Sequence, residues 1–224
     1  MPYNSSLATR AKLLAVAEAQ FAARGLESVT LSEITKAAGQ RNKSALNYHF
    51  GGKAGLLQAI IDKHQPDVVR RRHEMLDHLE THGDVTVETL MGAVVLPLAE
   101  KFDDPDGGPH YLSISAQLMS SPSYSELAIA HHAGHSHHTR LARLLLGVVP
   151  VQHTDSYLPR TLILAGMLLH SLADYINLRK NAPPSLHDPD TRLFVDTVVQ
   201  SMATIVTLPA SHSVRHRLLC NEPT

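Results

Sequence analysis

The sequence predicts an all-α protein of about nine helices, and three observations support this fold class. Over most of the 224 residues, apolar side chains recur three and four positions apart, the spacing that gathers them on one side of a helix. Glycine, proline and aspartate collect in short segments between these stretches, as in DDPDGGP at 103–109, and such segments form loops. The β-branched residues near the C-terminus also keep helical spacing, in a segment too long for a typical strand.

The N-terminal part of the chain predicts a loose arm followed by a first helix. Residues 1–8 are expected to be irregular, and the helix should run from about 9 to 24. Leu13, Leu14, Ala17 and Phe21 recur on one side of it and are expected to face inward.

A helix-turn-helix is predicted next. Thr30 and Glu33 form a T-x-x-E capping box, which marks the start of a helix. Gly39 is placed to end that helix. Asn42 can cap a second helix, which begins at Lys43 and points Leu46 and Phe50 inward.

The remaining helices are expected at 53–80, 86–102, 111–119, 122–146, 156–180 and 189–208. Pro66 should bend or break the first of these, and Pro97 should kink the second. The run Arg70-Arg71-Arg72 is interpreted as a solvated face. We predict domains at 1–65 and 66–209, followed by a polar tail at 210–224.

The outward side of the second short helix suits DNA. Lys43, Ser44, Asn47 and Tyr48 lie opposite its apolar side. Asn can bond adenine, Lys can meet guanine or phosphate, and hydroxyls can bond phosphate. Net charge is −1, yet residues 1–63 carry eight Lys and Arg against four acids, while the rest carries 12 against 17. A basic head on an acidic body indicates a DNA-binding regulator with a separate second function.

A family resemblance rests on the same residues. LSEITKAAGQRNKSALNYHFGGKAGLL resembles the DNA-binding segment of tetracycline-repressor-type (TetR) transcriptional regulators, through T-x-x-E-I, A-A-G, A-L-x-Y-H-F and K-x-x-L-L. It covers about the first quarter of the chain, and the turn GQRN is one residue longer than the commonest family pattern. The resemblance implies that Lys43, Ser44 and Asn47 enter the major groove and that Tyr48, His49 and Lys53 hold the DNA backbone. We expect Thr30, Arg41 and Asn42 to lie at the DNA as well.

The last two helices predict a homodimer. Leu162 to Leu172 is apolar nearly all round, and the final helix carries apolar residues on more than one face, namely Phe194, Val195, Val198, Val199, Met202, Ile205 and Val206. A helix that is apolar on several sides is buried on several sides, either by a partner subunit or within a monomer. The resemblance supports the dimer, in which two C-terminal helices from each subunit form a four-helix bundle. Two-fold symmetry then implies a palindromic double-stranded operator, read by heads about one DNA turn (~34 Å) apart.

The leading interpretation is a repressor that a small, mostly apolar effector releases from its operator. Candidate effector-binding residues, chosen as apolar or amphipathic positions of the middle helices, are Met91, Phe102, Tyr111, Met119, Met167 and His170. Each is also an ordinary core candidate. No cofactor is expected.

The alternative interpretation is a metal-dependent enzyme built on HHAGHSHH at 131–138. His131, His135 and His138 share one helical side, a spacing that could present imidazoles to a metal ion. The sequence has no H-E-x-x-H motif, nucleophile elbow or glycine-rich phosphate loop, so no enzymatic activity is expected. A nonspecific architectural DNA binder is disfavoured by the acidic body.

Compartment signals predict a cytoplasmic protein. Cys220 is the single cysteine, which excludes an intrachain disulfide and is typical of a reducing compartment. The N-terminal apolar stretch is interrupted by Lys12 and Glu18, so no secretory signal is predicted. The longest candidate membrane run, 161–169, has nine residues, against roughly 20 for a membrane span.

Overall fold

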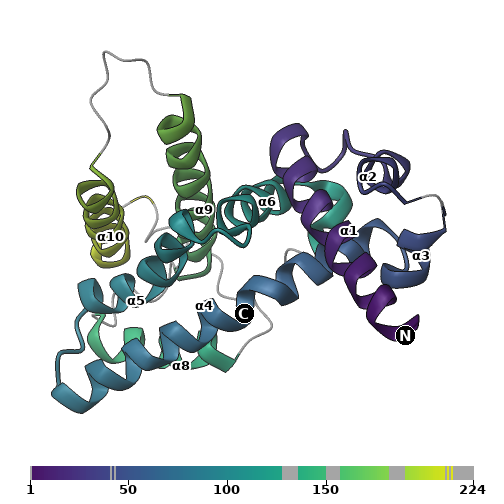
Figure 1. Ribbon diagram of the computed structural model, residues 1–224. Helices are drawn as coiled ribbons and strands as arrows, with labels where there is room; N and C mark the ends of the chain where they lie inside the picture. Colours follow the sequence, from purple (N-terminus) through teal and green to yellow (C-terminus); the bar gives the residue numbers. More distant parts are fainter. Residues whose placement is uncertain are drawn as a thin grey trace, which may run out of the picture.

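Every regular element that the structure describes is a helix, which confirms the all-α prediction. The computed structural model describes residues 2–40, 42, 44–127, 136–149, 157–181, 190–209, 211 and 213. Figure 1 shows a small head at one end and a larger helical body at the other.

The head consists of α1 (Pro2–Arg24), α2 (Leu31–Ala37), α3 (Ala45–Phe50) and the first turns of α4 (Lys53–His82). The inward sides predicted for these helices are confirmed. The expected loose arm at 1–8 was wrong, because α1 already begins at Pro2, and proline suits the first turn of a helix, where its missing N–H is not needed. The core of the head includes Leu13, Ala17, Phe21, Ile34, Leu46 and Ile60.

Helix α4 runs without interruption from the head into the body (Figure 1). Pro66 lies inside it and does not end it. A proline removes one helical hydrogen bond, and the buried side chains of Ile61, His64 and Val68 fix the helix on both sides of that position.

The body is built from the distal part of α4 and the elements that follow it. Its core includes Leu76, Leu90, Leu112, Leu172 and Val198. The elements are α5 (Val87–Ala99), the 3₁₀ turn η1 (Glu100–Asp103), α6 (Gly108–Ser120), the 3₁₀ turn η2 (Pro122–Tyr124), α8 (Ser136–Val148), α9 (Tyr157–Asn181) and α10 (Thr191–Thr207). The helix expected to open at residue 122 begins instead with η2, because the three residues after Ser121 take the tighter 3₁₀ winding.

Helix α6 belongs to both cores. Tyr111 packs in the body, whereas Ile114 and Leu118 pack against the head. Gln117 adds polar contacts to the head, since its Oε1 accepts from the Leu26 N–H at 2.8 Å and its Nε2 donates to the Phe21 carbonyl at 3.2 Å. Helix α6 therefore connects the head to the body through its side chains. The domain division near residue 65 stays a prediction.

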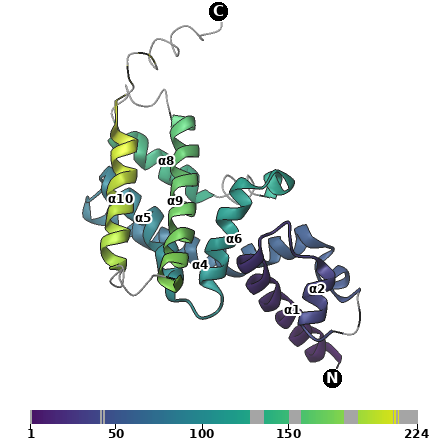
Figure 2. The same cartoon turned by 90° about the horizontal axis from the view of Figure 1, so that it is seen from above.

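Helices α9 and α10 lie side by side at the edge of the body (Figure 2). Val195, Val198 and Met202 of α10 face inward. Leu162 of α9 is 62% exposed, and Leu193 of α10 is 65% exposed. Both helices therefore present large apolar side chains to the outside in addition to those that fill the core.

One helix among the described residues, at Pro159–Asn181, is apolar and long enough to cross a membrane by length and composition alone. Of its most apolar window, 33% is buried in the protein. The run predicted from the sequence had only nine residues because it ended at a polar residue on each side, Arg160 and His170. Core helices of soluble proteins can meet the same criterion.

Candidate DNA-binding surface

Helix α2 is fixed at its start by the predicted capping box. The Thr30 N–H donates to Glu33 Oε2 at 2.8 Å, and the Glu33 N–H donates to Thr30 Oγ1 at 3.3 Å. The hydrogen bond from the Thr30 backbone, followed by that from Arg24, lowers the pKa of Glu33 to about 2. The Thr30 hydroxyl itself donates to Glu33 at 2.8 Å, so its first role here is to hold the helix start.

Helix α3 begins at Ala45 rather than at Lys43. The side-chain oxygen of Asn42 accepts from the Ser44 N–H at 2.9 Å, and its carbonyl accepts from the Ala45 N–H at 3.1 Å. Asn42 thus closes the turn before the helix, which moves the helix start two residues along the chain. Arg41 and Lys43, both predicted DNA contacts, lie outside the described residues.

The two sides of α3 differ sharply. Leu46 and Phe50 are buried against the head. Ser44 and Asn47 are exposed, and Tyr48 is 81% exposed. Because its opposite side is anchored, the short helix can present an amide and a phenol to a partner in a fixed direction.

His49 and Lys53 lie at the border of this surface. His49 is half-buried, and its ring meets that of Tyr48 edge to face, with 5.1 Å between centroids. Lys53 opens α4, and its Nζ lies 5.7 Å from the centre of the Phe21 ring. The free N–H groups and the dipole at a helix start favour an anion at such a position.

A glycine allows α3 and α4 to come close together. Gly55 packs against the carbonyl oxygen of Phe50, and an added Cβ would overlap that oxygen. The last turn of α3 therefore rests on the first turn of α4. This contact helps to set the direction in which Asn47 and Tyr48 leave the head.

Comparison with known proteins identifies this unit. Residues 13–60 match the model of the bacterial regulatory proteins, tetR family. The similarity to the tetR family is thus shown for residues 13–60, the segment that contains α2 and α3. Over 71 residues it is 38% identical to the HTH-type transcriptional regulator TtgR and to the probable HTH-type transcriptional regulator ArpR, both of Pseudomonas putida. The matched segment spans 32% of this chain and 30% of each relative.

The predicted effector-binding residues are spread through the body. Phe102 lines a cleft of about 240 Å³, together with Pro109, Ile176, Arg179 and Lys180. The other five predicted residues do not line this cleft. Met91 and Tyr111 are buried, Met119 and Met167 are partly buried, and His170 is exposed, with its Nε2 3.0 Å from Ser120 Oγ.

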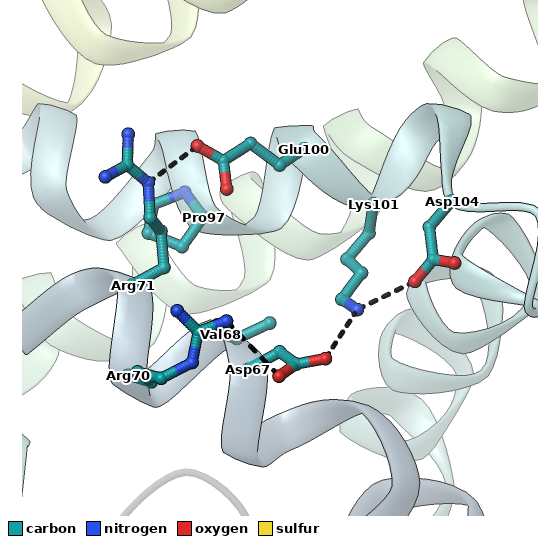
Figure 3. Close-up of a pocket in the computed structure, with 8 residues that line it drawn as sticks. All are labelled: Asp67, Val68, Arg70, Arg71, Pro97, Glu100, Lys101 and Asp104. Atoms are coloured by element: carbon teal, nitrogen blue, oxygen red, sulfur yellow. Dashed lines mark hydrogen bonds and ion pairs between the residues drawn. The ribbon is translucent and has the colours of Figure 1, made fainter.

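A second cleft, of about 270 Å³, lies between α4 and the end of α5 (Figure 3). Its walls are charged, and ion pairs cross it. Arg71 Nε lies 2.9 Å from Glu100 Oε1, and Lys101 Nζ lies 3.7 Å from Asp67 Oδ2. Because these charges satisfy one another, the cleft does not resemble the mostly apolar site that the sequence predicted.

The histidine-rich segment is described only in part. His131 and His135 lie outside the described residues, and so does the side chain of His138. Among the residues that are described, no three His, Cys, Asp or Glu side chains come together as a metal site would require. Cys220 also lies outside the described part of the chain.

Two buried polar features were not predicted from the sequence. Glu18 of α1 and His64 of α4 are each 2% exposed, with 3.0 Å between Oε1 and Nε2. Arg72, from the run interpreted as solvated, is only 7% exposed, which corrects that interpretation. A signal for Arg72 was present, because it stands four residues after Val68 and four before Leu76 and so falls on the buried side of α4.

Proposed function

We propose that this protein is a sequence-specific DNA-binding transcriptional regulator, a dimeric repressor that a small molecule releases from a palindromic operator. The observation that carries the proposal is the exposed side of α3, where Asn47 and Tyr48 project from a helix whose other side is anchored in the head. An exposed amide on such a helix can read an adenine edge, and a phenol can bond phosphate.

Charge supports DNA as the partner. The segment from Lys36 to Lys53 contains four basic residues and no acid. Basic side chains around a reading helix attract the phosphate backbone and account for most of the salt dependence of DNA binding. The similarity to the transcriptional regulators TtgR and ArpR further supports the assignment.

The exposed apolar side chains of α9 and α10 support the dimer. Leu162, Ile163 and Leu193 are more than half exposed, and large apolar side chains on neighbouring helices favour burial against a second copy. A two-fold dimer would carry two heads and would therefore read two half-sites of opposite direction.

Selection of bound fragments tests the proposal. Purified protein is mixed with sheared DNA of the source organism and an excess of random competitor at moderate salt, and the retained fragments are sequenced. We expect enrichment of a few palindromic sites, and weaker enrichment with Asn47→Ala. Retention without preference for any sequence would refute sequence-specific regulation.

A further inference from the structure

The imidazole of His64 lies between a carboxylate of the head and a carboxylate of the body. His64 stands on α4 between Ile61, which packs in the core of the head, and Val68, which packs in the core of the body. Its Nε2 lies 3.0 Å from Oε1 of Glu18 on α1, and both side chains are 2% exposed. Its Nδ1 lies 4.0 Å from Oδ2 of Asp104, the residue that follows η1. Each ring nitrogen of this buried histidine therefore faces an acid.

This arrangement favours a ring that carries a proton on both nitrogens. A neutral imidazole has one N–H donor and one acceptor, whereas an imidazolium has two donors. The contact between Nε2 and Glu18 needs its N–H at Nε2, because an ionised carboxylate only accepts. A neutral ring would thus turn the lone pair of Nδ1 towards Asp104, and the two would repel each other. A proton on Nδ1 replaces this repulsion by attraction.

Two lysines share the same carboxylates. Lys63 Nζ lies 3.0 Å from Oε2 of Glu18, and Lys101 Nζ lies 2.7 Å from Oδ2 of Asp104 (Figure 3). The hydrogen bond from Lys101 lowers the pKa of Asp104, so this carboxylate is charged at neutral pH. Burial disfavours a charged imidazole unless it is paired, and here an acid is available at both ends of the ring.

Neither lysine is reserved for the carboxylate that it shares with His64. Lys63 Nζ also lies 3.0 Å from Asp106, and Lys101 Nζ also lies 3.7 Å from Asp67. The positive charge of each lysine is therefore divided between two acids. Negative charge thus remains for a protonated imidazole to offset.

Helix α6 brings two further titratable groups to His64. The ring of Tyr111 stacks on that of His64 with 4.9 Å between centroids, and burial raises the pKa of Tyr111 to about 12. His110 also interacts electrostatically with His64, and burial, followed by repulsion from Lys180, lowers the pKa of His110. Both groups are therefore uncharged at neutral pH. The proton on His64 is accordingly governed by the acids and lysines of α1, α4 and η1 rather than by α6.

The proton decides how firmly the body is linked to the head at this point. With it, His64 donates to Glu18 of the head and attracts Asp104 of the body. Without it, the contact with Glu18 remains and the attraction to Asp104 is lost. Histidine ordinarily changes its charge between about pH 5 and 8. The link is therefore complete at the acidic end of this range and is weakened as the pH rises.

We propose that Glu18, His64 and Asp104 form a proton-dependent link between head and body, which is complete when both ring nitrogens of His64 are protonated. Its regulatory meaning rests on the proposed function. In a dimer, a firm link keeps the two heads at a fixed separation, so affinity for a palindromic operator should fall as the pH rises. The protonation of the ring itself can be measured without DNA.

Proton–nitrogen NMR of the full chain follows the ring nitrogens of His64 from about pH 5 to about pH 8. Asp104→Asn should weaken proton binding at Nδ1 about tenfold or more, the usual effect of losing an opposite charge at this distance. The variant keeps the shape of the side chain and the oxygen Oδ1, which accepts from the Asp106 N–H at 2.9 Å. It is therefore expected to fold. Unchanged proton binding at Nδ1 in Asp104→Asn would overturn the proposal.

Asp103→Asn is the matched control. The side chain of Asp103 is 76% exposed and pairs with Arg179 at 3.0 Å, so this change removes a neighbouring acid that does not face His64. Proton binding at Nδ1 should be unchanged in this variant. If Asp103→Asn weakens it as much as Asp104→Asn does, the specific link to Asp104 is refuted.

DNA binding tests the regulatory part. Anisotropy titrations at about pH 6 and about pH 8 compare a palindromic fragment from the selection with a fragment that carries one half-site. We expect the affinity for the palindrome, relative to the half-site, to fall at least about fivefold at the higher pH. This fall should be absent in His64→Gln and in Asp104→Asn, and retained in His110→Gln. A ratio that does not change with pH, or that changes equally in Asp104→Asn, would overturn the switch.

The two sets of measurements distinguish this inference from the proposed function. Weakened proton binding in Asp104→Asn, in a protein without preference for any DNA sequence, would refute the proposed function alone. Sequence-specific DNA binding, in a protein whose Nδ1 binds its proton equally well with and without the Asp104 carboxylate, would refute this inference alone.

Discussion

Replacing Gly107 by alanine should weaken the junction between head and body. Gly107 precedes α6 with φ +91°, a backbone conformation that L side chains rarely adopt. An added Cβ would lie 2.5 Å from Glu18 Oε2. Glu18 has little freedom to retreat, because Lys63 and His64 each hold one of its oxygens at 3.0 Å.

The expected loss in the free energy of unfolding has two parts. The left-handed backbone costs about 1–2 kcal/mol for a residue with a side chain. Displacing a buried carboxylate from its hydrogen-bond donors adds about 1–3 kcal/mol. We therefore expect Gly107→Ala to lower the free energy of unfolding by roughly 2–5 kcal/mol and Tm by on the order of 10 °C.

Gly83→Ala is the matched control. Gly83 ends α4 with φ +74°, and an added Cβ would meet nothing within 4 Å. Gly83→Ala should lower the free energy of unfolding only by the backbone contribution, about 1–2 kcal/mol. Urea unfolding followed by circular dichroism measures both variants. If Gly107→Ala costs no more than Gly83→Ala, the reasoning about Glu18 is wrong.

Four further predictions concern the DNA surface, the dimer and the capping box. Asn47→Ala should weaken operator binding by about 1–3 kcal/mol and relax sequence preference at one position; equal weakening on all DNA in anisotropy titrations would contradict base reading. Lys53→Ala should reduce the salt slope of binding by about 1, and an unchanged slope would remove it from the phosphate contacts. Leu162→Glu should give monomers by light scattering, since it places a charge on an exposed apolar position of α9, whereas a persistent dimer would place the interface elsewhere. Glu33→Gln should lower Tm at neutral pH because the folded protein lowers the pKa of Glu33 from 4.5 to about 2. The stabilisation is present above pH 4.5 and is lost as the pH falls towards 2, so a Tm difference that persists at pH 2 would argue against this origin.

The parts of the fold that were predictable from sequence depend on neighbours along the chain. The capping box joins Thr30 to Glu33, and the buried side of α3 joins Leu46 to Phe50, so each signal lies within about one helical turn. The same local signals predicted that the side chains of Asn47 and Tyr48 are exposed, as the structure shows.

The surroundings of Arg72 were not predictable in this way. Its burial depends on the carbonyl that Pro97 leaves without a donor, on another helix. Glu18 similarly owes its burial to Lys63 and His64, which become its neighbours only when α1 packs on α4. A polar side chain is expected to be exposed when only its residue type is considered. Which polar side chains are buried instead depends on packing between segments that are distant in the sequence. Whether the six predicted effector residues line one site likewise depends on packing between distant segments, and their role stays a prediction.

The shared membership of α6 has a practical consequence for protein engineering. A fragment cut near residue 65 would retain α3 but would lose Ile114 and Leu118, which pack in the core of the head. It would also leave the Leu26 N–H without its acceptor on Gln117. A chimera that joins this head to the body of another protein should therefore also include α6, residues 108–120.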